Sequence, residues 1–492
     1  MASTVKHGLI YFLGNVLSRL AGFVMLPVYT RVLTTGDYGI LEILSLSIDV
    51  LGMLAGLGIR QAVLRLYYQY DTTEDRSGVV STAALLLVAI FASIAAILLA
   101  FSSQISAALL GPNQPVLLLR LALLAFVLGT LGDIPGVYLQ ARQRSSALVL
   151  SNFVRLVLAL SLNILFIVIL RTGVAGIFLS TILSAVVVGG FMAIMMFRET
   201  GIRFVPRIAR ALVSFGSPLV ASSIGSFVLH FSDRYFLRHF HSLAIVGVYS
   251  LSYRFAMLIA MLVDGPFYSI WSAKAFEIER REGAAAPPIL RSILLQYNLV
   301  VVTAAFGVAL FATDVIHIML GAEFRAADGP VPLLALAMVF FCYRHMSQTG
   351  AMIRKKSGYI AVVTSAAAAT ALLLNLLLIP RWGAMGAASA TAGAFALEFL
   401  VMNSLSERTY PIGLKVRELF APLAIASGVW AAAAVAVPDG AGPMTGLAIR
   451  IAAFGAYAIV LSATGILSPS ARQLLIRSAR EPRAIMNALR SA

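Results

Sequence analysis

The chain has 492 residues, of which 60% are hydrophobic and 12% are charged. Its mean hydropathy of +0.92 excludes a soluble globular protein, because too few polar residues are present to cover a water-facing surface. The net charge of +16 first suggests a nucleic-acid partner, and the position of the basic residues must decide that question. The only cysteine, Cys342, leaves no thiol pair for a disulfide, a redox centre or a zinc site.

The apolar stretches have the length of about 20 residues that an α-helix needs to cross a bilayer, and they lack the short alternation of an outer-membrane barrel. The sequence therefore predicts an all-α, polytopic membrane protein of about fourteen transmembrane helices. The first span contains Arg19 and is too long for a signal-peptide core, so we expect it to be retained. The expected spans are 8–31, 38–62, 79–101, 116–139, 147–170, 174–197, 211–231, 244–270, 289–312, 331–350, 358–379, 384–404, 418–437 and 446–466.

Basic residues are distributed unevenly between the two sets of loops that these spans define. The loops on the side of the N-terminus hold 24 of the 37 lysines and arginines. The opposite loops hold six, which are Arg31, Arg171, Arg234, Arg238, Arg325 and Arg381. The positive-inside rule then places both termini in the cytoplasm of a bacterial inner membrane. The charge needs no nucleic acid to explain it.

The two halves of the chain contain an internal repeat. The segment 144–181 aligns with 356–391, Gly173–Gly176 aligns with Gly383–Gly386, and Tyr38–Gly39 aligns with Val246–Gly247. Each copy contains six helices, which predicts two parallel six-helix lobes related by a pseudo-two-fold axis, with a substrate site between them. The expected divisions are a lobe at 1–197, a cytoplasmic amphipathic linker at 198–210, a second lobe at 211–404, helices 13 and 14 at 405–467, and a basic cytoplasmic tail at 468–492.

Apart from Arg31 and Arg291, which lie close to the ends of their spans and are counted with the loops, seven arginines fall inside the expected spans, and four of them lie too deep to reach the headgroups easily: Arg19, Arg155, Arg254 and Arg344. Each deep arginine costs about 2.5–3.5 kcal/mol in hydrocarbon, so we expect these side chains to face a wet cavity or a partner. Apart from Glu418, the first residue of its span, the spans contain only five carboxylates, which are Glu42, Asp49, Asp133, Asp264 and Glu398. The resulting positive excess favours an anionic, phosphate-bearing substrate, since guanidinium groups bind phosphate with paired hydrogen bonds.

The acidic residues have two open interpretations. Asp49, Asp133 and Asp264 are either counter-ions of the arginines or sites for a coupling proton or Na⁺. One stripe of polar and small residues supports a wet helix face, because its members recur every three or four positions: Glu42, Ser45, Asp49, Gly52, Gly56 and Arg60.

Motifs for covalent chemistry are missing from the sequence. No lysine follows a glycine, so the phosphate loop of an ATP-driven pump is absent. His239 and His241 have no cluster of carboxylates or cysteines near them in the sequence, so we expect no metal site there. We therefore expect no enzyme activity, no catalytic residue and no cofactor.

Three stretches carry a family resemblance: Gly14–Gly22 (GNVLSRLAG), Leu26–Leu33 (LPVYTRVL) and Asp37–Leu41 (DYGIL). A second copy runs from Ser214–Pro218 (SFGSP) through Asp233–Arg234 to Gly247–Leu251 (GVYSL). With these motifs the sequence resembles the oligosaccharide flippases of the MOP superfamily, the Wzx-like polysaccharide transporters, over nearly its whole length.

The resemblance implies the export of an undecaprenyl-diphosphate-linked oligosaccharide repeat unit from the inner to the outer leaflet by alternating access, for O-antigen, capsule or exopolysaccharide synthesis. It also implies that the diphosphate is held in a cationic cavity, with membrane lipid around it and a polysaccharide polymerase as a candidate partner. By physical role, Arg19, Arg155, Arg254 and Arg344 would bind the diphosphate or acidic sugars. Two alternatives stay open, a lipid II flippase and a cation-coupled multidrug exporter of the same superfamily.

Overall fold

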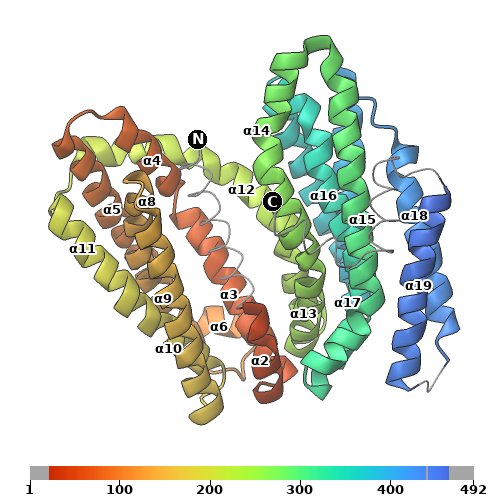
Figure 1. Ribbon diagram of the computed structural model, residues 1–492. Coiled ribbons are helices and arrows are strands. Elements are labelled where there is room, and N and C mark those ends of the chain that lie inside the picture. Colours follow the sequence, from red (N-terminus) through yellow and green to blue (C-terminus); the bar gives the residue numbers. More distant parts are fainter. Residues whose placement is uncertain (1–21, 439–441, 465–492) are drawn as a thin grey trace. The chain divides into compact units, whose positions relative to one another are not determined.

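The structure, a computed structural model, describes residues 22–438 and 442–464 (Figure 1). Within these ranges the chain forms helices joined by short turns, and it forms no strand. This confirms the prediction of an all-α membrane protein. The helices group into two compact units, and the division falls between Leu251 and Ser252, with parts of later helices returning to the first unit.

The first unit comprises the described residues up to Leu251 together with 319–327 and 364–394. Its helices are α2 (Leu26–Val32), α3 (Thr35–Ala55), α4 (Ile59–Gln69), α5 (Thr73–Ala100), α6 (Ser102–Leu110), α7 (Val116–Gly129), α8 (Asp133–Ala141), α9 (Ser145–Asn163), α10 (Val174–Ser184), α11 (Gly190–Thr200), α12 (Pro206–Phe240) and the start of α13 (Leu243–Ile259). Their buried faces meet in an apolar core around Ile59, Val79, Leu87 and Phe126. The predicted linker 198–210 includes the end of α11, a non-helical stretch and the start of α12.

The second unit comprises 252–318, 328–363 and the described residues from Phe395 onward. It contains the end of α13, α14 (Gly265–Glu282), α15 (Ala286–Met319), α16 (Val331–Ile353), the two ends of α17 (Ser357–Thr409), α18 (Val416–Ala436) and α19 (Pro443–Ala463). Helices α18 and α19 pack side by side (Figure 1). The division into lobes, linker and tail that the sequence predicts stays a prediction, and the tail 468–492 lies outside the described residues.

Nine helical stretches in the described residues are long and apolar enough to cross a membrane, or ten if one bent pair counts as a span. Two of these stretches, Leu243–Met319 and Ser357–Thr409, have 77 and 53 residues and so are longer than one crossing requires. The expected count of fourteen is consistent with this arrangement and stays a prediction. The most apolar part of Ser145–Ile169 has a mean hydropathy of 2.2, but only 11% of it is buried inside the protein. Its apolar surface must therefore face lipid. The protein is a multi-pass membrane protein.

The internal repeat is visible in the backbone. Gly173 has φ 61° and ψ −141°, and its repeat partner Gly383 has φ 52° and ψ −127°. Both conformations lie at positive φ, where glycine avoids the steric strain of a side chain. Gln143 and Lys355, 212 positions apart, likewise have positive φ of 55° and 58°. Equivalent positions of the two copies therefore break their helices in the same way.

A second pair of equivalent glycines lies in direct contact. A Cβ atom on Gly39 would lie 1.9 Å from the carbonyl oxygen of Leu243, and one on Gly247 would lie 2.2 Å from that of Thr35. Only glycines allow α3 and α13 to approach this closely. The motif DYG near residue 39 and its copy near residue 247 thus form one helix crossing within the first unit.

The structure corrects three local predictions. The span 38–62 is interrupted where Leu57 and Gly58 have positive φ, so Arg60 lies on α4 and the polar stripe does not reach it along one helix. Arg234, expected in an external loop, lies inside α12 and is 1% exposed. Asp314, also expected in a loop, lies inside α15. For Arg234 and Asp314 the charged residue lowered the local hydropathy although the helix continues, whereas the break at Gly58 leaves no mark in hydropathy.

Candidate functional site

The first group of candidate residues lies in the first unit, around a break between helices. Asp133 opens α8 directly after the 3₁₀ turn η1 (Thr130–Gly132). Its carboxylate lies 3.5 Å from Arg60, whose side chain is 64% exposed. An ion pair this exposed contributes little, about 0–1 kcal/mol. Asp133 also interacts electrostatically with Arg155, so two guanidinium groups share one carboxylate.

Arg155 lies on α9 and is partly buried. Its Nη1 atom lies 3.5 Å from the place that a Cβ atom on Gly132 would occupy, beside Gly189. Gly189 ends a π-helical segment, η3 (Ala185–Gly189), which packs against η1. The carboxylate nearest in effect to Arg155 is that of Asp133, which Arg60 also contacts, so the positive charge exceeds the negative charge around this break.

Asp49, the third candidate of this unit, lies on α3 and is exposed. Its nearest titratable neighbours are Glu42 on the same helix and Tyr235 on α12. The Tyr235 hydroxyl lies 3.0 Å from the Ser47 hydroxyl, so its position is held by α3. No ion pair neutralises Asp49 within the described part of the chain, which leaves its carboxylate available to water or to a cation.

Arg254 and Arg344 belong to the second unit, and Arg19 lies outside the described residues. Arg254 is partly buried on α13 and has interaction partners. Arg344 lies on α16 with its guanidinium carbon 4.7 Å from the centre of the Phe341 ring. Its buried Nε atom has no hydrogen-bond partner, and no carboxylate of the described residues pairs with it. A partly buried guanidinium with unused donors is suited to an anion.

Asp264 is the centre of a hydrogen-bonded cluster in the second unit. It ends the π-helical segment η4 (Ala260–Asp264) and is 4% exposed. The Tyr297 hydroxyl donates to Asp264 Oδ1 across 2.5 Å, and Nδ1 of His345 lies 2.9 Å from the same oxygen. The structure thus surrounds this acid with a tyrosine and a histidine that the sequence prediction had not included. A signal existed, because His345 directly follows the candidate Arg344 on one helix.

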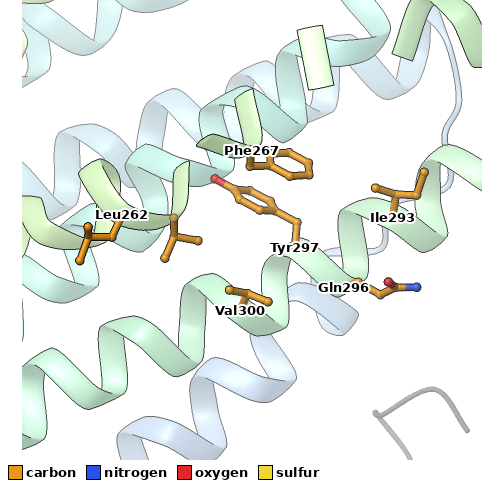
Figure 2. A pocket seen from close by; sticks show the side chains of 7 residues that line it. Leu262, Phe267, Ile293, Gln296, Tyr297 and Val300 are labelled. Atoms are coloured by element: carbon orange, nitrogen blue, oxygen red, sulfur yellow. The ribbon is translucent and has the colours of Figure 1, made fainter. Parts of the chain in front are cut away.

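Tyr297 also forms part of an apolar groove of about 360 Å³ on the second unit. Figure 2 shows the Tyr297 and Phe267 rings stacked in this groove, and the Tyr297 hydroxyl points away from Ile293 and Gln296. The two ring centres are 3.8 Å apart. The tyrosine therefore connects the groove with the acidic cluster, since its ring lines the groove and its hydroxyl reaches Asp264.

A buried ion pair in the first unit was missed. Asp233 and Arg234 are 3% and 1% exposed, and their charged atoms are 2.7 Å apart. Tyr249 donates a hydrogen bond of 2.6 Å to Asp233 Oδ2, and Thr391 donates one of 3.3 Å to the same atom. The signal was present in the second copy of the family motif, where adjacent opposite charges follow an apolar helix. Hydropathy alone assigned this motif to a loop.

The remaining polar candidates have structural partners. His241 contacts the carbonyl oxygen of Ile379 at 2.8 Å. In the described residues no three histidine, cysteine or carboxylate side chains come together as a metal site. Arg450, expected near a span end, forms a 2.5 Å ion pair with Asp314, and both side chains are less than one-fifth exposed.

Comparison with known proteins identifies the family. Residues 4–270 match the family described as polysaccharide biosynthesis protein. Over 195 residues the chain is 29% identical to a probable low-salt glycan biosynthesis flippase, Agl15, of Haloferax volcanii. That match covers 38% of this chain and 40% of the relative, so the likeness spans less than half of either protein.

Solved structures share the fold at low sequence identity. The lipid II flippase MurJ in an inward closed conformation matches with a TM-score of 0.70 and 13% identity, over 94% of this chain and all of that one. A multidrug resistance MATE transporter of the MOP superfamily, in an inward-facing conformation, matches with a TM-score of 0.61 and 18% identity, over 80% of this chain and 95% of that one. The fold is shared with these transporters, and the family match covers more than half of the sequence, so this chain belongs to the polysaccharide biosynthesis protein family.

Proposed function

We propose that this protein is a flippase for an oligosaccharide repeat unit linked to undecaprenyl diphosphate. It moves this lipid from the inner to the outer leaflet of a bacterial cytoplasmic membrane by alternating access, with both termini in the cytoplasm. The reaction involves no covalent chemistry and no cofactor. The exported unit then becomes available to a polysaccharide polymerase. Family membership supports the transport of a glycan lipid, and the charge of the candidate site supports the diphosphate.

One observation carries the diphosphate assignment: Arg344 has no carboxylate partner among the described residues, and Arg155 shares the single carboxylate of Asp133 with Arg60. An unpaired guanidinium in hydrocarbon costs about 2.5–3.5 kcal/mol, and a phosphate-bearing substrate would offset this cost with charge-assisted hydrogen bonds. An exporter of organic cations would gain from the opposite charge. A lipid II flippase remains an alternative cargo assignment, because lipid II also carries a diphosphate.

The test replaces the candidate arginines in a host strain that lacks its own flippase. We expect Arg155→Ala, Arg254→Ala and Arg344→Ala each to lower polysaccharide export by about 10- to 150-fold, the effect of losing one or two charge-assisted hydrogen bonds. Arg155→Lys should retain part of the activity, since it keeps the charge but loses the fork. Export is measured as surface polysaccharide, and protein abundance is measured in isolated membranes.

Arg381→Ala is the matched control, because Arg381 is exposed at the break in α17. This variant should export normally. Normal export in both Arg155→Ala and Arg344→Ala would overturn the cationic-site assignment. Proteoliposomes that move lipid II but no other glycan lipid would replace the proposed cargo with lipid II.

A further inference from the structure

The cluster around Asp264 contains an acid and a base that share a hydrogen bond in a nearly closed environment. The side chains of Asp264 and His345 are 5% and 12% exposed. Because Asp264 Oδ1 already accepts the hydrogen of Tyr297, an ionised carboxylate requires that Nδ1 of His345 also donates. The Nε2 atom is then the position at which His345 gains or loses a proton. Nε2 has no hydrogen-bond partner among the described residues.

The other charged and titratable groups around the cluster keep a constant charge, so only this proton changes the net charge of the cluster. Tyr268 of α14 stacks on the His345 ring with centres 4.0 Å apart. Cys342 of α16 interacts with Tyr297 and Asp264, and Arg344 lies near Cys342. Tyrosine and cysteine side chains are ordinarily neutral at pH 7, and arginine is always charged. The cluster therefore changes its net charge through the histidine, from a neutral carboxylate–imidazolium pair to a single buried negative charge.

A small cavity lies next to the histidine. It has a volume of about 10 Å³, which is close to the space that one water molecule needs. His345 and Thr349 supply polar atoms to its wall, and Tyr268 and Trp271 supply aromatic rings. Trp271 donates a hydrogen bond of 3.0 Å to the Thr349 hydroxyl. A water molecule in this cavity would give Nε2 a partner for proton exchange.

The helix that carries Asp264 is interrupted at this residue. The π-helical segment η4 ends there, and Pro266 follows in the first turn of α14. Proline cannot donate a backbone hydrogen bond, and π segments are points at which helices bend. A change of charge on His345, beside Asp264, therefore acts where the backbone ladder between α13 and α14 is already incomplete.

We propose that Asp264, His345 and Tyr297 form the binding site of a coupling proton, held at Nε2 of His345. Release of this proton to water leaves the Asp264 carboxylate buried without a neutralising cation, and the α13–α14 helix relieves this by bending at η4 so that water reaches the carboxylate. The claim that this proton drives transport rests on the proposed flippase function. The existence of the proton site does not.

The proton site is tested with the purified full-length protein, using Trp271 as a reporter. The other two of the three tryptophans are removed by Trp382→Phe and Trp430→Phe. We expect the Trp271 fluorescence to change in a pH titration, because an imidazolium in the shared cavity quenches the indole. His345→Gln and His345→Asn should abolish this transition.

Two further variants sharpen the result. Asp264→Asn should weaken proton binding and so displace the transition from its position in the parent protein, since the neutralising anion is gone. His317→Gln is the control, because His317 is 45% exposed and pairs with Asp328 away from the cluster. The absence of a transition in the parent, or its persistence in both His345 variants, would overturn the proton site.

Coupling is tested separately in proteoliposomes that contain a lipid-linked oligosaccharide and an imposed pH gradient. We expect the rate to depend on the direction of the gradient in the wild type and to lose this dependence in His345→Gln. A wild-type rate that ignores the gradient would overturn coupling. A protein that shows the fluorescence transition but moves no lipid-linked oligosaccharide under any gradient would refute the proposed function and support the proton site.

Discussion

Replacement of Asp233 by asparagine should destabilise the protein strongly. The substitution removes the charge that faces Arg234 at 2.7 Å in a site where both side chains are at most 3% exposed. It also weakens the acceptor of the hydrogen bond from Tyr249. Breaking a buried ion pair by removing one partner costs about 3–5 kcal/mol. The unfolding equilibrium should therefore shift by about two to three and a half powers of ten, measured by titration with SDS in detergent micelles and circular dichroism.

Two comparisons isolate the buried charge as the cause. The double variant Asp233→Leu with Arg234→Met should regain most of the lost stability, because it removes both charges together and fills the space with apolar atoms. Glu277→Gln breaks an exposed pair with Lys274 and should leave the unfolding curve within error of the wild type. If the double variant is as unstable as Asp233→Asn, the loss comes from packing or polar contacts and the electrostatic reasoning fails.

Two further predictions concern packing and pairing. Gly39→Val should lower stability by at least about 1–3 kcal/mol because its Cβ would lie 1.9 Å from the Leu243 carbonyl oxygen. The control is Gly190→Ala, which has open space around its Cβ position. Equal thermal stability of the two variants in detergent would contradict the close approach. Arg450→Met should destabilise the protein more than the double variant Arg450→Met with Asp314→Leu, since the single variant leaves a carboxylate that is 18% exposed without its cation. The opposite order of denaturation midpoints would show that the two charges are not coupled.

The helical membrane fold was predictable because its cause is local and additive. A stretch of about 20 apolar residues favours a spanning helix whatever its neighbours are. The repeat was predictable for a related reason, since equal sequences impose equal backbone conformations. The positive φ of Gly173 and Gly383 is the structural counterpart of two aligned glycines. These features depend on short segments and not on which segments finally meet.

Pairing between distant helices was not predictable in the same way. A charge inside a span lowers the mean hydropathy equally whether or not another helix supplies its partner, so Asp314 was assigned to a loop although it pairs with Arg450. The candidate Asp264 was identified by its type and depth, but its partners Tyr297 and His345 lie 33 and 81 positions away. No spacing rule relates such positions. The proposed roles of Arg155, Arg254, Arg344 and the acids stay predictions until the variants are measured.

The pairing of each charge with its partner says more about an anionic substrate than the number of charges does. A count over the sequence finds more arginines than acids inside the spans. Asp314 and the Asp233–Arg234 pair are also buried, so they change this count, but they do not change the charge that a substrate would meet. A neutralised pair has no charge left to offer. Arg344 differs, because no carboxylate of the described residues forms an ion pair with it and its Nε atom has no acceptor, and Arg155 shares the single carboxylate of Asp133 with Arg60. Arginines at such positions face a wet cavity or a partner, and our prediction is that a diphosphate supplies acceptors to both.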